Sequence, residues 1–294
     1  MPFAEAPGSK LHYETTGVGT PIVFVHETAA DSRTWEAQIR WFSRFYQCIT
    51  FNARGFAPSD RPLPTSNYQR YYEDIGCVMD AVGVSKAFLV GHSMGAYSAV
   101  HFALNHPERA LGIVLAGIGS GSSNVEEYRA EIRSLSDKLR EDGMEAMSKP
   151  LAFAPSRIQL HNKDFRGWSE FHRHLNEHDA EGTADALKYF HSSRPVLYEF
   201  EADLRLMQVP TLIAVGDEDT QCIDPSIFLK RTIPASGLWM CPRTGHPIHL
   251  EEPSQFNEAV QSFLHAVQQN AWGARDPRSI GTNLFVHETA PARG

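Results

Sequence analysis

The chain of 294 residues has few cysteines and no long apolar run. Its four cysteines are widely spaced and form no C-x-x-C pair, which argues against structural zinc and against a disulfide framework. The longest strongly apolar runs, such as Ile22–Val25 and Leu212–Val215, are far shorter than the ~20 residues that span a bilayer. The N-terminus has no basic start followed by an apolar stretch, so no secretory signal is expected. The reduced cytoplasm is therefore the expected compartment.

Basic residues are also fewer than acidic ones. The chain has 27 Lys and Arg against 35 Asp and Glu, for a net charge of −8, and no basic cluster. A nucleic-acid partner is therefore not expected, and neither is a membrane. With 42% hydrophobic and 21% charged residues the composition is that of a globular protein. The expected partner is a small-molecule substrate, and a homo-oligomer stays open.

Short apolar strands alternate with helices over the first 116 residues. The predicted strands cover residues 10–15, 22–26, 46–51, 87–91 and 111–116. The predicted helices between them cover residues 35–45, 68–82 and 94–104. This rhythm predicts an α/β fold with a doubly wound, mostly parallel sheet.

The alternation stops after Gly117 and resumes near Pro210. The segment between them is polar and helical in pattern, with helices expected at 126–143, 164–178 and 182–192. Beyond it, strands are expected at 210–215 and 238–241, and helices at 225–231 and 253–269. We therefore predict a core of residues 1–122 and 206–270, a helical cap inserted at 123–205, and a loose C-terminal tail at 271–294.

A nucleophile motif stands at one strand-to-helix junction. Residues 91–95 read GHSMG, between the apolar run that ends at Val90 and the helix expected from Met94. This is the G-x-S-x-G pattern in the strand–turn–helix setting that the motif requires. Glycine on both sides would relieve crowding in so tight a turn, and the helix N-terminus adds partial positive charge. Ser93 is therefore the candidate nucleophile.

A serine needs a general base and a group that orients it. Downstream, one predicted strand ends in the acidic sequence Gly216-Asp217-Glu218-Asp219, and the next ends in Thr244-Gly245-His246. Both segments follow the carboxyl ends of parallel strands, at the same sheet edge as Ser93. With an ordinary pKa near ~6.5, His246 is suited to take the serine proton and return it to a leaving group.

Together these segments resemble the α/β-hydrolase superfamily, in its serine esterase and lipase-like branch with a helical cap. The resemblance covers about residues 10–122 and 205–268. It rests on residues 22–26 followed by Trp35-Glu36, on residues 52–62 (NARGFAPSDRP), on GHSMG, on residues 209–219 (VPTLIAVGDED), and on residues 245–253 (GHPIHLEEP).

The resemblance assigns roles to particular residues. It implies a catalytic triad of Ser93, Asp219 and His246, because the acid of the family usually stands three residues after the glycine that ends its strand. Asp217 is then expected to serve the turn or to face the solvent. The resemblance also implies an oxyanion hole made by the backbone N–H groups of Met94 and Thr28. It implies neither a cofactor nor a metal.

The sequence departs from the family at Glu27, which stands beside Thr28 where relatives often have glycine. An ionised carboxylate close to a developing oxyanion would slow the reaction. We therefore expect Glu27 to point away toward a donor in residues 31–35. Other interpretations are that it is held neutral, that it meets a cationic part of the substrate, or that it only fixes the loop.

Other residues receive weaker predictions. His174 and His178 stand four apart on a predicted helix, but no third ligand completes a metal site, so they are expected on a polar cap surface. Trp168, Phe171 and Tyr189 could line a pocket, although packing of the cap is the more frequent role of such residues. Core packing is also expected for Trp35. Cys222, close to the acid, has no predicted base and is expected to be inert.

The sequence therefore predicts a hydrolase that cleaves an ester, thioester, lactone or activated amide through an acyl-serine intermediate. Two alternatives use the same triad: a cofactor-free haloperoxidase-like perhydrolase and a C–C bond hydrolase. A third belongs to another class, a catalytically silent ligand-binding relative, and the complete set of Ser93, Asp219 and His246 weighs against it. A serine nucleophile argues against haloalkane dehalogenases and epoxide hydrolases, whose nucleophile is an aspartate.

Overall fold

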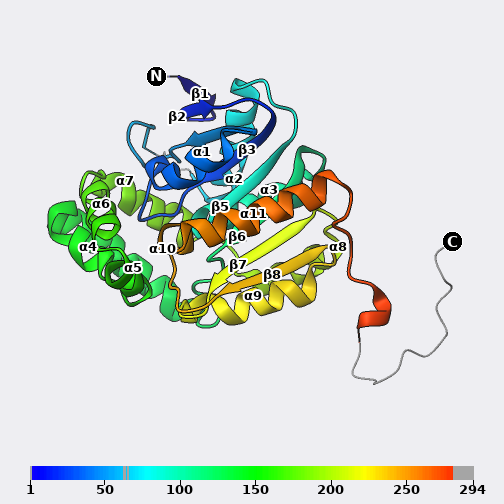
Figure 1. The fold of residues 1–294 in the computed structure, drawn as a ribbon. Coiled ribbons are helices and arrows are strands. Elements are labelled where there is room, and N and C mark those ends of the chain that lie inside the picture. The colour runs from blue at the N-terminus through cyan, green and yellow to red at the C-terminus, as the bar shows by residue number, and fades with distance from the viewer. Residues whose placement is uncertain (1, 62–63, 65, 281–294) are drawn as a thin grey trace.

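A computed structural model describes residues 2–61, 64 and 66–280, and these form an eight-stranded sheet (Figure 1). Its spatial order is β1-β2-β4-β3-β5-β6-β7-β8. The strands are β1 Phe3–Ala6, β2 Ser9–Thr16, β3 Thr20–Val25, β4 Tyr46–Phe51, β5 Ala87–His92, β6 Ala110–Ala116, β7 Thr211–Gly216 and β8 Ser236–Cys241. The β1 and β2 strands run antiparallel, whereas every pairing from β4 to β8 is parallel. The predicted doubly wound, mostly parallel α/β fold is confirmed.

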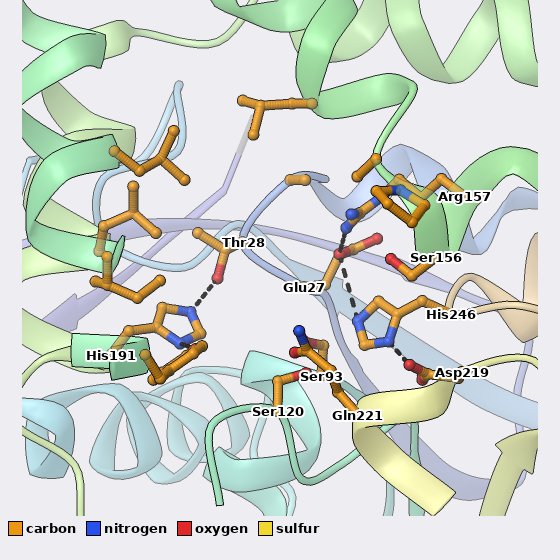
Figure 2. A pocket seen from close by; sticks show the side chains of 18 of the residues that line it. Glu27, Thr28, Ser93, Ser120, Ser156, Arg157, His191, Asp219, Gln221 and His246 are labelled. Atoms are coloured by element: carbon orange, nitrogen blue, oxygen red, sulfur yellow. Dashed lines mark hydrogen bonds and ion pairs between the residues drawn. The ribbon is translucent and has the colours of Figure 1, made fainter. Parts of the chain in front are cut away.

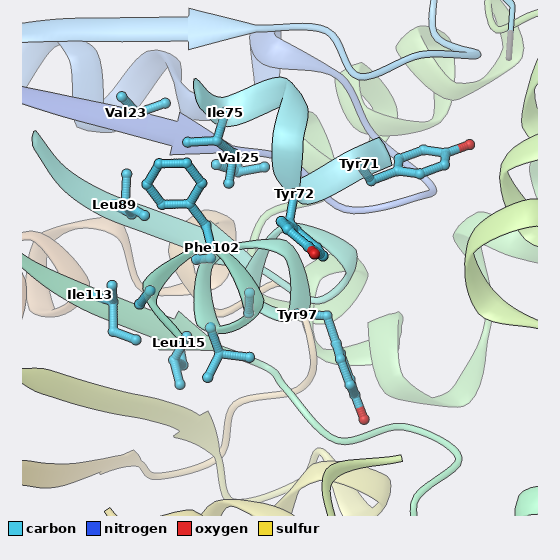
Figure 3. Close-up of a cluster of buried hydrophobic side chains, with 14 of the residues drawn as sticks. Val23, Val25, Tyr71, Tyr72, Ile75, Leu89, Tyr97, Phe102, Ile113 and Leu115 are labelled. Carbon is cyan, nitrogen blue, oxygen red and sulfur yellow. The ribbon is translucent and has the colours of Figure 1, made fainter. Parts of the chain in front are cut away.

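Helices cover both faces of this sheet. They are η1 Ser32–Trp35, α1 Glu36–Phe42, α2 Tyr68–Ala81, α3 Met94–Asn105, η2 Pro107–Arg109, α9 Thr220–Thr232, α10 Ile248–Glu251 and α11 Pro253–Gln268. Along β3, Val23 and Val25 pack toward α2 and α3 (Figure 3), and Ile22 and Phe24 pack toward α1 and α11. A strand buried on both faces needs an unbroken apolar run, which is why 22–25 contains no polar residue. The prediction that Trp35 packs in the core is confirmed, because it is buried with Ile22 and Phe24 on the sheet face covered by α1 and α11.

The insertion contains helices joined by short turns, and none of its described residues forms a strand (Figure 1, green). Its elements are α4 Val125–Ala152, η3 Pro155–Arg157, α5 Ile158–Lys163, α6 Phe165–Asn176, α7 Ala180–Ala186, η4 Leu187–His191, η5 Leu197–Phe200 and α8 Glu201–Leu206. Gly143, with φ 77°, interrupts α4, and the helix continues beyond it to Ala152. Trp168, Phe171 and Leu175 belong to a separate apolar core inside the insertion.

Several boundaries differ from the prediction. The edge strand β1 was not predicted, because only Ala4 of its four residues is buried and the pattern is correspondingly weak. The segment predicted as one helix at 35–45 is a 3-10 turn, η1, followed by a short α1. The α9 helix begins at Thr220, so Pro225 lies inside it rather than at its start.

The beginning of the tail is anchored to the core. The indole N–H of Trp272 donates to the carbonyl of Ala235 at 3.0 Å, and its ring lies 4.8 Å from that of Phe263. Trp272, within the segment predicted as a loose tail at 271–294, therefore contacts the core, and residues 281–294 lie outside the described residues. None of the described helices combines the length and the apolar character needed to cross a bilayer.

Candidate active site

Ser93 lies at the sharp turn between β5 and α3, with φ 51° and ψ −109°. Positive φ is uncommon outside glycine and marks a strained backbone. The turn needs glycine on both sides. A Cβ on Gly95 would lie 2.0 Å from the carbonyl oxygen of Val25, and a Cβ on Gly91 would lie 2.3 Å from that of Gly95. The motif therefore forms the tight turn that the sequence indicates, with Ser93 at the edge of a cavity.

His246 and Asp219 form a buried pair, on the loops that follow β8 and β7. His246 donates from Nδ1 to Asp219 Oδ2 at 2.7 Å, which leaves Nε2 unprotonated when the ring is neutral. Burial alone would lower the pKa of His246, but the charge and hydrogen bond of Asp219 outweigh it and raise that pKa above its ordinary value. Asp217 instead accepts the backbone N–H of Thr244 at 3.2 Å, a contact that serves the turn.

Ser93 and His246 line the same cavity (Figure 2). Within the described residues, the Ser93 hydroxyl has no hydrogen bond to the ring. Catalytic hydrogen bonds are often long or poorly aligned before substrate binds, so the lack of this bond does not exclude His246 as the base. The structure thus brings together all three residues that the sequence predicts as a triad.

Glu27 is directed at His246 and not away from it. Its side chain is 3% exposed, and its Oε2 lies 3.9 Å from Nε2 of His246. The prediction that Glu27 points toward a donor in residues 31–35 is wrong. Instead, Arg157 of η3 in the insertion donates to Glu27 (Figure 2). Burial would raise the pKa of Glu27, but Arg157 outweighs it, with His92 and His246 adding to the effect, so that pKa is below its ordinary value. Glu27 is therefore a buried carboxylate beside the candidate base, with its charge balanced from the insertion.

His92 completes the polar layer beneath the pair. It donates from Nε2 to the carbonyl of His246 at 2.8 Å, and its Nδ1 lies 3.7 Å from Glu27 Oε1. Burial lowers the pKa of His92 to about 4, so the ring is neutral near pH 7. The insertion holds the same loop, because the N–H of His246 donates to the carbonyl of Ser156 at 2.7 Å. Core and insertion together fix the position of His246.

The predicted oxyanion donors are free to receive a ligand. His26 donates from Nδ1 to the carbonyl of Glu27 at 2.7 Å and accepts at Nε2 from the N–H of Ala53 at 2.9 Å. The two polar groups of a trans peptide point in opposite directions, so the N–H of Thr28 is turned away from His26. Across the described ranges, neither this N–H nor that of Met94, at the N-terminus of α3, has a hydrogen-bond acceptor.

On the wall opposite His246, another buried histidine, His191, contacts Thr28 (Figure 2). The hydrogen bond between Thr28 Oγ1 and His191 Nε2 measures 2.5 Å, and that between Tyr128 Oη and His191 Nδ1 measures 2.8 Å. Burial lowers the pKa of His191 well below its ordinary value. Sequence reasoning missed His191, Tyr128 and Arg157, because each contacts the site from a distant part of the chain. The insertion at 123–205 contains five histidines, and this content was the signal that could have indicated His191.

The cavity above Ser93 has a volume of about 630 Å³. Its floor is polar, and the walls contributed by the insertion are largely apolar. The leucine and isoleucine residues of these walls are Ile132, Leu135, Leu139, Leu151, Leu175 and Leu187. Trp168, Phe171 and Tyr189 do not line this cavity. The packing role is confirmed for Trp168 and Phe171, which lie in the apolar core of the insertion, where the indole N–H of Trp168 donates to the carbonyl of Ala152.

Groups that could hold a metal are few. In the described part of the chain, the one cluster with suitable spacing is Asp219, Cys222 and His246, which coincides with the acid–base pair. Burial raises the pKa of the Cys222 thiol well above its ordinary value, so the thiol stays protonated. His178 contacts Asp31 at 3.1 Å and His174 contacts Arg173 at 3.0 Å, so both already have protein partners.

Comparison with known proteins gives a consistent result. Residues 20–253 match a family described as the alpha/beta hydrolase fold. The chain is 28% identical over 268 residues to a 2-hydroxy-6-oxononadienedioate/2-hydroxy-6-oxononatrienedioate hydrolase of Burkholderia vietnamiensis, covering 87% of this chain and 91% of the relative. It is 28% identical over 267 residues to a 2-hydroxy-6-oxo-6-phenylhexa-2,4-dienoate hydrolase of Burkholderia cepacia, with the same coverage.

A solved structure is also similar. It is described as Est816, an N-acyl homoserine lactone degrading enzyme, and superposes with a TM-score of 0.76 at 26% identity. The match covers 89% of this chain and all of the other.

Proposed function

This chain is a hydrolytic enzyme of the α/β-hydrolase family, and we propose that it cleaves an ester, thioester, lactone or activated amide of a small molecule through an acyl-serine intermediate. One observation carries the proposal: Ser93 on its strained turn and the hydrogen-bonded pair His246–Asp219 line the same cavity. A nucleophile, a base and an orienting acid at one site are the set that acyl transfer requires.

In this mechanism Ser93 Oγ attacks the substrate carbonyl while His246 Nε2 takes its proton. The oxyanion that forms accepts hydrogen bonds from the backbone N–H groups of Thr28 and Met94, which have no other acceptor in the described structure. His246 then returns the proton to the leaving group and activates water to release the acyl group. Asp219 keeps the His246 ring in the tautomer with its proton on Nδ1, so that Nε2 is free to take the serine proton.

The insertion at 123–205 supplies the substrate pocket as the cap of the enzyme. The six leucine and isoleucine side chains that line its walls favour an apolar acyl chain or ring. The cavity volume of about 630 Å³ is ample for a medium-sized group. The lactone named for the similar structure belongs to the proposed class of substrates. The free cysteines and the charge of −8 support a cytoplasmic enzyme without a nucleic-acid partner.

The test is covalent labelling and turnover. Wild-type protein should react at Ser93 with a fluorophosphonate probe and hydrolyse p-nitrophenyl esters of two to ten carbons. Ser93→Ala should lose a factor of about 10⁶ in kcat while keeping the unfolding transition of the wild type. Retention of more than a few per cent of the turnover in Ser93→Ala would refute the proposal.

A second candidate is cleavage of a C–C bond beside a ketone. It is favoured by the similarity to two hydrolases whose names describe oxo-dienoate substrates. The purified enzyme should be offered 2-hydroxy-6-oxo-6-phenylhexa-2,4-dienoate and p-nitrophenyl butyrate in parallel. A kcat/KM for the dienoate a hundredfold above that for the ester would favour the second candidate.

A further inference from the structure

The hydroxyl group of Thr28 has a contact network that the mechanism above does not use. Thr28 Oγ1 contacts His191, His191 contacts Tyr128, and the guanidinium of Arg194 lies 3.4 Å from the hydroxyl of Tyr128. Thr28 comes from the core loop after β3, and the other three residues come from the insertion. The network therefore joins the cap to the loop that holds a proposed oxyanion donor.

The donor and acceptor of each hydrogen bond in this network can be assigned by starting from Arg194. Arg194 is buried and fixed, with one nitrogen donating to the carbonyl of Ser120 at 2.6 Å and its guanidinium 3.8 Å above the ring of Tyr97. A guanidinium can only donate, so the hydroxyl of Tyr128 accepts from Arg194. That hydroxyl then has its own proton available for His191 Nδ1, at 2.8 Å.

The tautomer of His191 follows next. The ring is buried and neutral, because burial first and the charge of Arg194 second lower its pKa well below the ordinary value. A neutral ring that accepts at Nδ1 must carry its proton on Nε2. His191 therefore donates from Nε2 to Thr28 Oγ1. The hydroxyl proton of Thr28 cannot point back at His191 and must point to another acceptor.

In the described structure, no protein group accepts that proton. Thr28 and Ser93 line the same cavity, and the backbone N–H of Thr28 is likewise without an acceptor. A threonine can direct its N–H and its O–H at a single oxygen. We propose that the Thr28 hydroxyl is a third, side-chain donor to the oxyanion, and that His191, Tyr128 and Arg194 are positioning residues that aim its proton. This inference rests on the acyl-serine reaction proposed above.

The experiment compares Thr28→Val with Thr28→Ser. Valine keeps the shape and the backbone N–H but has no donor, whereas serine keeps the hydroxyl. Loss of an oxyanion donor costs about 10²- to 10³-fold in kcat. Thr28→Val should lose about 10²-fold in kcat on p-nitrophenyl butyrate with KM within threefold of wild type, and Thr28→Ser should retain at least a third of kcat.

Tyr128→Phe tests the relay itself. Without the tyrosine proton, His191 can adopt the other tautomer and accept from Thr28, which turns the hydroxyl proton away from substrate. We expect about a tenfold loss of kcat in Tyr128→Phe, and no further loss when it is combined with Thr28→Val. Independent losses that multiply in the double variant would overturn the relay.

A boronic acid separates transition-state stabilisation from a structural effect. Its tetrahedral adduct with Ser93 places an oxygen in the oxyanion position, so its affinity should fall in Thr28→Val by the same factor as kcat/KM. A Thr28→Val enzyme whose kcat is within threefold of wild type, or whose defect is confined to KM, would overturn the proposal. Fluorophosphonate labelling of wild-type Ser93 is the separating control, because its failure refutes the acyl-serine reaction itself and not Thr28 alone.

Discussion

Replacing Glu27 by glutamine should shift the pH dependence of the enzyme to lower pH. The carboxylate lies 3.9 Å from His246 Nε2, and at an effective dielectric constant of ~20 this distance corresponds to about 4 kcal/mol of attraction for the protonated ring. That would equal about 3 pKa units for His246 if it acted alone. Arg157 pairs with the same carboxylate but stays in place in Glu27→Gln, so its own effect on His246 is unchanged and does not offset the loss. We therefore expect the pKa of His246 to fall by about 1 to 3 units.

The sign follows from the role of His246. The ring acts as a base only when neutral, and Glu27 raises its pKa by favouring the protonated form. Glu27→Gln should therefore lower the pKa of His246 and move the acidic limb of kcat/KM down by at least about one unit. The measurement is kcat/KM for p-nitrophenyl acetate between pH 4.5 and 9, in a buffer of constant ionic strength.

Arg157→Gln is the matched control, because it removes the opposite charge from the same ion pair. It leaves the carboxylate of Glu27 uncompensated, so its acidic limb should move up in pH. The double variant should lie close to wild type. Shifts of the same direction in both single variants, or no shift in either, would refute the electrostatic reasoning. Thermal unfolding of all three should be recorded, because breaking a buried pair is itself destabilising by about 3–5 kcal/mol.

Three further predictions concern the acid, the pocket and the turn. Asp219→Asn should lower kcat by about 10⁴-fold and Asp217→Asn by less than tenfold, in a direct comparison on one ester; the reverse order would identify Asp217 as the acid. Leu135→Phe should raise KM for p-nitrophenyl decanoate several-fold but not for the acetate, and the exposed Leu206→Phe should change neither. Gly95→Ala should destabilise the fold by about 3 kcal/mol in urea unfolding, and wild-type stability would show that the turn tolerates a side chain.

Local patterns in the sequence predict the parts of this protein that depend on neighbouring residues. The strand at 46–51 and the turn at Ser93 follow from apolar runs and from a five-residue motif, and both are present as predicted. Glu27 was recognised as unusual, because relatives often have glycine there and a charge beside the oxyanion would slow the reaction. The identity of its partner was beyond reach, since 130 residues separate Glu27 from Arg157 and no local periodicity links them.

The same limit applies to the insertion. Its helical character is visible in the sequence, but Trp168 and Phe171 face its interior, and the cavity walls come from α4 and from positions such as Leu187. Which face of a helix meets the cavity depends on how helices pack against one another. The relay through His191 is invisible for the same reason, because Thr28 lies 163 residues away in the chain.

The ion pair between Glu27 and Arg157 also bears on how this protein can be re-engineered or can have evolved. The loop after β3 carries a buried negative charge, and the positive charge that balances it comes from the inserted helices. A chimera that takes these helices from a relative without an equivalent arginine would keep an uncompensated carboxylate beside His246. Exchange of the insertion is therefore expected to succeed only if an equivalent arginine is kept or if position 27 changes to an uncharged residue in the same step.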